Sequence, residues 1–210
     1  MAESQVRGSM LRSVFLALSG MRKARALSEE RIASSLSPAA IRLIEHAPLP
    51  IGWYPVSIYR EALDLFWEVG ARGDAALLAR GGAEVARKIF HDTAYREFFG
   101  SERGHRARDR DDLMRRLRFV TRLNRLFYDD IELAASYDPE RDEVSLTYEN
   151  AAEFSEAMFV GTHGHLDELA SLAFGLHDEA GKPQIRWHAS RPTADRIVFS
   201  HPAAPFVTTA

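Results

Sequence analysis

Hydrophobic residues recur with the period of a helix through the first half of the chain. In SMLRSVFLAL they fall on one face, at Leu11, Val14, Phe15 and Leu18. SPAAIRLIEH begins with an N-cap serine and a proline at the first helical position, which are signals of a helix start. PVSIYREALDLFW, GGAEVARKIF and DLMRRLRFVTRLNRLF carry the same apolar period. Gly82 lies on the apolar face of its predicted helix, so we expect another backbone to approach it closely.

The apolar period then changes from 3.6 to 2. Alternating residues in IELAASY and VSLTY, joined by the turn DPERDE, predict a β-hairpin. A long helix follows and ends at Gly175, and Asn150 with Glu153 resembles a capping box at its start. QIRWHA and IVFS predict a second hairpin.

This order of elements predicts an α+β fold, with an N-terminal helical half packed on a C-terminal four-stranded antiparallel β-β-α-β-β unit. We expect a single domain over residues 8–202, with residues 1–7 and 203–210 as flexible termini. The chain of 210 residues, 46% of them hydrophobic, is long enough to bury one substantial core.

Charge and cysteine content exclude several classes of function. The net charge of −3 gives no overall field that would attract nucleic acid, so we expect no nucleic-acid partner. The absence of cysteine excludes disulfides, thiolate metal sites and cysteine nucleophiles, and it is typical of a reducing compartment. No segment has the roughly 20 apolar residues of a membrane span. We therefore predict a cytoplasmic protein.

Motifs of catalysis are absent from the sequence. It has no Gly-x-Ser-x-Gly elbow, no Gly-rich phosphate loop and no His-Glu-x-x-His helix. In THGHLD, His163 and His165 lie about 200° apart on a helix, with Asp167 and Glu168 nearby. Because the two imidazoles would point to opposite sides, we expect no metal site there. We predict no catalytic residue, no metal and no cofactor.

Four parts of the chain carry a family resemblance: VRGSMLRSVF, LSPAAIRLIEHAPLPIGWYPVSIYREALDL, the GGAEVARKIF helix and the hairpin-helix-hairpin tail. Together they resemble an uncharacterised family abundant in myxobacteria, which is distantly similar to vinyl-reductase-type and haem-nitric-oxide-binding-type ligand domains. The resemblance implies a helical half on a small antiparallel sheet and a ligand-sensing or adaptor module, and it does not imply catalysis. The tail ASRPTADRIVFS has no cysteine for the metal site of such relatives, and the chain has no Tyr-x-Ser-x-Arg run to hold haem propionates.

Five residues are candidate ligand contacts: Tyr54, Tyr59, Arg116, Met158 and His165. His165 falls on the apolar side of the long helix, where a neutral imidazole would either contact a ligand or be hydrogen-bonded in the core. Arg116 falls on the apolar side of its own helix. It must pair with a carboxylate such as Glu132, extend its head to solvent, or hold an anion.

The two tyrosine candidates belong to an aromatic cluster ahead of a predicted helix, in PIGWYPVSIYREALDLFW. We expect Trp53, Tyr54 and Trp67 mainly to fasten this helix onto the core, since each ring buries a large area. The hydroxyls of Tyr54 and Tyr59 need hydrogen-bond partners, which makes these two residues the members best suited to a binding pocket.

An arginine stripe is the other candidate site. It consists of Arg115, Arg118, Arg122 and Arg125, which share one helix face at i, i+3, i+7 and i+10. Guanidinium groups match carboxylates and phosphates, so the stripe is predicted to hold an anionic ligand or an acidic partner. The alternative is a solvated face neutralised by acids such as Asp111.

The sequence thus predicts a non-catalytic ligand-sensing or signalling/adaptor domain that binds a small molecule or a protein partner. The alternative is a pure protein-protein interaction adaptor, working as a homodimer or hetero-complex with no ligand. An internal cavity of roughly a few hundred Å³ lined by Met158, His165 and Tyr59 would favour the first hypothesis. A filled interior with an extensive apolar surface patch would favour the second.

Overall fold

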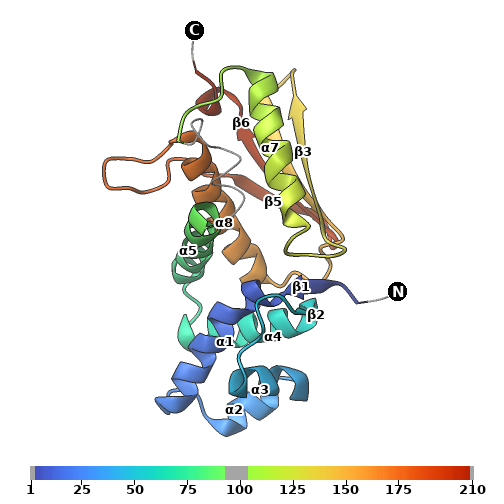
Figure 1. The fold of residues 1–210 in the computed structure, drawn as a ribbon, viewed down its shortest axis with the longest axis vertical. Coiled ribbons are helices and arrows are strands. Elements are labelled where there is room, and N and C mark those ends of the chain that lie inside the picture. The colour runs from blue at the N-terminus through green and yellow to red at the C-terminus, as the bar shows by residue number, and fades with distance from the viewer. Residues whose placement is uncertain (1–2, 93–103, 209–210) are drawn as a thin grey trace.

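The computed structural model describes residues 3–92 and 104–208. Helices of the N-terminal half occupy one end of an elongated molecule, and a small sheet occupies the other (Figure 1). The helices of this half are α1 (Gly8–Lys23), α2 (Glu29–Ser35), α3 (Pro38–Glu45), α4 (Val56–Leu65) and α5 (Ala75–Asp92). The predicted start of α3 is confirmed, because Ser37 Oγ accepts a hydrogen bond from the Ala40 N–H at 3.3 Å.

The C-terminal half consists of α7 (Arg110–Asn124), β3 (Glu132–Asp138), β4 (Glu143–Glu149), α8 (Glu156–Phe174), β5 (His188–Thr193) and β6 (Arg196–Pro202). The four strands form an antiparallel sheet in the order β3-β4-β6-β5. The predicted α+β class, with a helical half and a β-β-α-β-β unit, is therefore confirmed.

One face of this sheet is buried. Leu146 and Phe199 lie opposite each other in the register of β4 and β6, so both side chains project from the same face. Phe159 of α8 stacks on Phe199, with ring centroids 5.9 Å apart. Helix α7 packs against β3, the terminal strand of the sheet (Figure 1). The helices thus cover the apolar face of the sheet.

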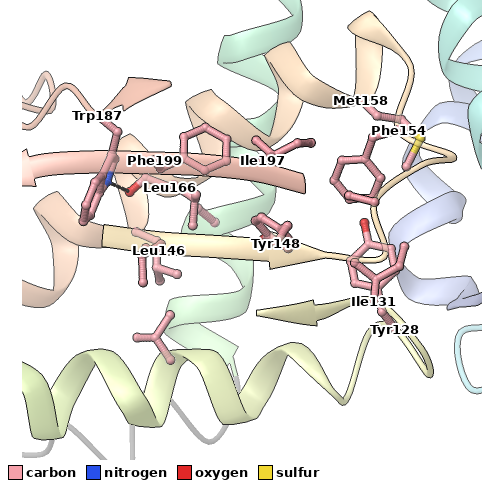
Figure 2. Packing of buried hydrophobic residues seen from close by; sticks show 14 of the residues in the cluster. Tyr128, Ile131, Leu146, Tyr148, Phe154, Met158, Leu166, Trp187, Ile197 and Phe199 are labelled. Carbon is pink, nitrogen blue, oxygen red and sulfur yellow. Dashed lines mark hydrogen bonds between the residues drawn. The ribbon is translucent and has the colours of Figure 1, made fainter. Parts of the chain in front are cut away.

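The two halves share a single hydrophobic core. Buried side chains of the helical half, such as Phe15, belong to the same cluster as Phe199 in the sheet. Figure 2 shows Tyr128, Tyr148 and Phe154 grouped where the sheet meets the helical half. The centroid of the Phe154 ring lies 5.9 Å from that of Tyr128 and 5.6 Å from that of Tyr148. Contacts between the halves are therefore part of the core itself.

Both segments predicted as flexible termini contribute to the fold, so these predicted boundaries were wrong for the residues that the structure describes. Strand β1 (Gln5–Arg7) pairs with β2 (Trp53–Pro55), and Val6 is fully buried. At the other end, Phe206 is also fully buried in the short 3-10 helix η3 (Ala204–Phe206). Buried apolar side chains and backbone hydrogen bonds to distant residues hold these segments, which are too short to show a periodic pattern in the sequence.

Two local predictions around the helices also need correction. Helix α8 begins after Ser155, whose Oγ accepts a hydrogen bond from the Met158 N–H at 3.4 Å; Asn150 is not its cap. Asn150 instead lies in a turn with φ 60°. The helix ends as predicted, at Gly175 in the left-handed conformation with φ 67°.

The aromatic stretch before α4 is less buried than predicted. Its WYP sequence forms strand β2, and a π-helical turn, η1 (Phe66–Gly70), follows α4. Trp53 is 38% exposed, with the Arg7 guanidinium 4.2 Å above its ring, and Trp67 is half-buried. The deeply buried tryptophan is Trp187, whose Nε1–H donates to the Leu166 carbonyl at 3.2 Å (Figure 2).

Candidate functional site

A cavity of about 270 Å³ lies where the helical half meets the β-β-α-β-β unit. We call it the central cavity. Helices α1, α4, α5 and α8 form its walls, together with the end of α7 and the residues after it. Three of the five candidate ligand contacts, Tyr59, Met158 and His165, line it together. The cavity thus has the size and the three lining residues expected for the ligand-binding hypothesis.

Glycines bring α5 and α8 into backbone contact beside the central cavity. A Cβ atom at Gly82 would lie 1.9 Å from the Gly161 carbonyl oxygen, and one at Gly164 would lie 2.1 Å from the Ala79 carbonyl oxygen. No side chain fits at either position without a shift of the backbone. Gly82 and Gly161 themselves line the cavity, so this close crossing builds part of its wall.

His165 contributes a neutral imidazole to the central cavity. Burial lowers the pKa of His165 to about 4, and hydrogen bonding with the Gly82 backbone opposes this shift only in part. Its Nδ1 is buried and has no hydrogen-bond partner among the residues that the structure describes. An unsatisfied buried polar atom costs about 1–3 kcal/mol, so a partner supplied by a bound molecule would be favourable.

Three tyrosines group at the sheet end of the central cavity. They are Tyr59 of α4, Tyr128 after α7 and Tyr148 of β4. Burial raises the pKa of Tyr59 to about 12. Burial also raises the pKa of Tyr128, and the nearby Tyr59 and Tyr148 hydroxyls raise it further. The phenols of Tyr59 and Tyr128 are therefore neutral at physiological pH, and they offer hydroxyl groups without charge.

The remaining wall of the cavity is mostly apolar, and its mouth is polar. Apolar side chains along the wall include Met10, Val14, Leu63, Phe66 and Phe127. The exposed residues Ser13 of α1 and Gly81, Glu84 and Lys88 of α5 also line the cavity. The cavity therefore opens to solvent between α1 and α5.

Tyr54 and Arg116 do not line the central cavity. The Tyr54 hydroxyl accepts a hydrogen bond from the Leu49 N–H at 2.9 Å, which fastens the loop ahead of β2. The Arg116 side chain is 2% exposed and pairs with Asp112, one turn earlier on α7, at 2.9 Å. Arg116 also donates to the His105 carbonyl at 2.9 Å. Pairing with a carboxylate is thus correct, but the partner is Asp112 rather than Glu132.

The arginine stripe has different partners along its length. Arg115 is bound to Asp112 at 2.5 Å, and Arg125 lies 3.9 Å from Glu132. Arg118 and Arg122 are exposed, and they form no ion pair with any residue in 3–92 or 104–208. Together with Arg115 they line a second depression of about 800 Å³ between α7 and β3. We call this depression the α7–β3 groove.

The side chains of THGHLD are used within the fold. His163 Nε2 donates to the Trp187 carbonyl at 2.7 Å, and Asp167 accepts from the Trp187 N–H at 3.0 Å. Glu168 is buried and bound by Arg87 at 2.9 Å, with His177 Nε2 at 3.2 Å. Within the described parts of the chain, no group of three or more His, Cys, Asp or Glu is placed to hold a metal ion.

Sequence reasoning missed Tyr128 and Tyr148 as cavity residues. Tyr148 occupies an inward position of a predicted strand, and this pattern shows only that it is buried. Tyr128 follows the end of a predicted helix. Only the packing of both segments against α4 brings these hydroxyls close to Tyr59.

No protein-family model matches the chain, and no curated protein or solved structure matches it either. Among the helices of the described residues, none combines the length and the apolar character needed to cross a bilayer.

Proposed function

We propose that this protein is a non-catalytic ligand-sensing domain that binds a small molecule in the central cavity. The observation that carries this proposal is a cavity of about 270 Å³ lined by Tyr59, Met158 and His165 from two different helices. We infer a cytoplasmic setting, which the absence of cysteine supports.

The size of the cavity limits the size of the ligand. An apolar protein cavity of about 150 Å³ holds benzene. A cavity of about 270 Å³ therefore suits a molecule of roughly ten to fifteen non-hydrogen atoms, such as a two-ring compound. A bulkier ligand would have to extend through the mouth between α1 and α5.

The wall chemistry favours a neutral, mostly apolar ligand with one or two hydrogen-bonding groups. The lining carries neutral phenols at Tyr59 and Tyr128 and a neutral imidazole at His165. An ionised group placed deep in this cavity would lose its hydration without gaining a counter-charge. The charged side chains among the described lining residues, Glu84 and Lys88, are at the exposed mouth.

Ligand binding at this position would affect both halves of the molecule. Tyr59 belongs to the helical half, whereas Met158 and His165 belong to the β-β-α-β-β unit. A ligand that contacts both halves stabilises the arrangement in which its contacts are complete. Such a domain reports the presence of its ligand through the packing of its own helices.

Native mass spectrometry of the freshly purified protein tests the proposal, combined with a thermal-shift screen of small neutral aromatic compounds. We expect a bound small molecule, or compounds that raise the melting temperature by about 5 °C or more near 100 times their Kd. In Ala17→Phe, the new ring would fill the cavity and abolish this effect, since Ala17 lines it. Ala33→Phe, at an exposed position of α2, is the matched control and should behave like the parent protein.

Two outcomes would overturn the proposal. One is that no compound binds the parent protein better than it binds Ala17→Phe. The other is that Ala33→Phe and Ala17→Phe lose binding equally, because the effect would then not be specific to the cavity. A ligand-free protein that forms a stable dimer would instead favour the adaptor hypothesis.

A further inference from the structure

The α7–β3 groove has two walls of different character. The helix wall carries Arg115, Arg118 and Arg122, with Met114 and Phe119 beside them, and the strand wall is formed by residues 135–137 of β3. Helix and strand run side by side (Figure 1), so the groove is elongated. It is separate from the central cavity, because no described residue lines both.

The strand wall is a free sheet edge in the described parts of the chain. β3 is the terminal strand in the order β3-β4-β6-β5, and it pairs with β4 over its whole length. Outside that pairing, the described residues make no backbone-to-backbone hydrogen bond to residues 132–138. An edge strand of this kind presents N–H and C=O groups to which another extended chain can pair.

The helix wall carries two arginines that have no ion-pair partner among the described residues. Arg118 and Arg122 are exposed and form no ion pair with a described residue, and Asp111 is the one acid among the described residues that line the groove. The net charge of the groove lining is therefore positive, although the chain as a whole carries −3. Such a surface attracts carboxylate-bearing partners at short range.

The spacing of these arginines fits an extended chain. Arg118 and Arg122 are one helical turn apart, which is about 6 Å along the axis. Side chains on one face of an extended strand repeat every two residues, which is about 6.6 Å. A strand lying along β3 with acidic residues at alternate positions would therefore bring successive carboxylates opposite Arg118 and Arg122.

A second copy of this chain fits the groove less well. Two-fold pairing of β3 with β3 of another copy would place identical surfaces against each other. Arg118 and Arg122 of the two copies would then face one another, and like charges in contact are destabilising. Charge complementarity thus points to an acidic occupant.

We propose that the α7–β3 groove binds an extended acidic segment of a partner protein by strand addition to β3. Backbone groups of the segment pair with the β3 edge, and acidic side chains at every second position pair with Arg118 and Arg122. The proposal does not depend on a ligand in the central cavity, because it uses a different surface.

Fluorescence anisotropy with a short labelled peptide in which glutamate alternates with valine tests this proposal. We expect binding at low salt that weakens as salt is added, because exposed ion pairs are screened. The Arg118→Gln/Arg122→Gln variant should bind about tenfold more weakly. Arg80→Gln/Arg141→Gln removes the same charge at exposed positions outside the groove and should bind like the parent protein.

Matched peptides separate strand addition from charge attraction alone. Replacing every glutamate by glutamine should weaken binding about as much as the double arginine variant does. Two further peptides carry methyl groups on the backbone nitrogens of alternate residues, one at the odd positions and one at the even positions. One of the two should not bind, because one edge of the peptide must donate N–H groups to β3.

Several results would overturn the proposal. They are no binding of the glutamate peptide at low salt, equal binding by the double arginine variant, or undiminished binding by both methylated peptides. Preferential binding of a single-stranded oligonucleotide would assign the groove to nucleic acid instead. A dimer in sedimentation that is lost in the double variant would assign it to a second copy.

Discussion

Gly82 of α5 faces the backbone of Gly161 of α8 so closely that a Cβ atom on Gly82 would lie 1.9 Å from the Gly161 carbonyl oxygen. Helices that cross with side chains between them keep their axes 8–10 Å apart, whereas glycine permits a closer approach. At this crossing α5 is held against the His165 turn of α8, and both helices then form the wall of the central cavity. The geometry of the cavity therefore depends on the absence of a side chain.

Gly82→Ala is expected to destabilise the protein by about 2 kcal/mol or more, because the added methyl group must push α5 away from α8. Chemical denaturation monitored by circular dichroism would measure the change. Gly81→Ala is the matched control, since nothing lies within 4 Å of a Cβ atom there. It should stabilise the helix by about 0.5–1 kcal/mol. Equal effects of the two substitutions would contradict the close crossing.

The pH dependence of stability should report the buried state of His165. Burial lowers the pKa of His165 to about 4 from an ordinary value of 6.5. Between these values the unfolded chain binds a proton that the folded protein excludes, so the free energy of unfolding falls as pH decreases through this window. The expected loss is on the order of 2 kcal/mol, measured by urea denaturation across the window.

His165→Gln should flatten this part of the pH profile, because it removes the titrating group. His188→Gln changes an exposed histidine of β5 and should leave the profile unchanged. A profile that is the same in His165→Gln and the parent protein would mean that His165 is solvated and titrates normally.

Asp112→Asn should be strongly destabilising because it removes the counter-charge of a buried arginine. Burial alone would raise the pKa of Asp112, but hydrogen bonds from Arg116, the Arg108 N–H and Arg115 outweigh it and lower the pKa to about 2. Leaving Arg116 without this carboxylate is expected to cost about 3–5 kcal/mol. Asp111→Asn, at the exposed neighbouring position, should change the melting temperature little. Similar losses in both variants would contradict the pairing.

The buried Trp187 and the partly exposed Trp53 allow a direct test of which aromatic side chain contributes to the core. Trp187 is 2% exposed and packs against Phe206, with ring centroids 5.7 Å apart. Trp187→Ala should cost about 3–5 kcal/mol, whereas Trp53→Ala should cost about 1 kcal/mol or less. Both stability losses would be measured as shifts in the denaturant midpoint, with the denaturant dependence of the unfolding free energy unchanged. A larger loss for Trp53 would mean that β2 contributes more to the core than the segment ahead of β5.

Regular elements could be predicted from the sequence because each leaves a periodic signal. The alternation in β3 and β4 specified the first hairpin, and Gly175 specified the end of α8. Features that depend on a single residue could not be predicted in this way. Val6 and Phe206 lie in segments too short to show a period, and the backbone partners that hold these segments are distant in sequence, so no local pattern distinguishes them from disordered termini.

The candidate site was predictable in part. Tyr59, Met158 and His165 could be identified because each combines an inward position with a functional group. The failure at Arg116 has a physical cause: the same inward position also suits an ion pair, and Asp112 at i−4 was available on the same helix. The proximity of Tyr128 to Tyr59 in the cavity depends on tertiary packing alone, and no local pattern encodes it.

Helix α7 borders both proposed binding sites. Its last residue, Asn124, lines the central cavity, whereas Arg122, only two positions earlier, lines the α7–β3 groove. Because a helix moves as a nearly rigid rod, a ligand in the central cavity that shifts α7 would also change the shape of the α7–β3 groove. By thermodynamic reciprocity, a small molecule that raised the affinity of the groove for an acidic peptide would itself bind with higher affinity once that peptide was bound.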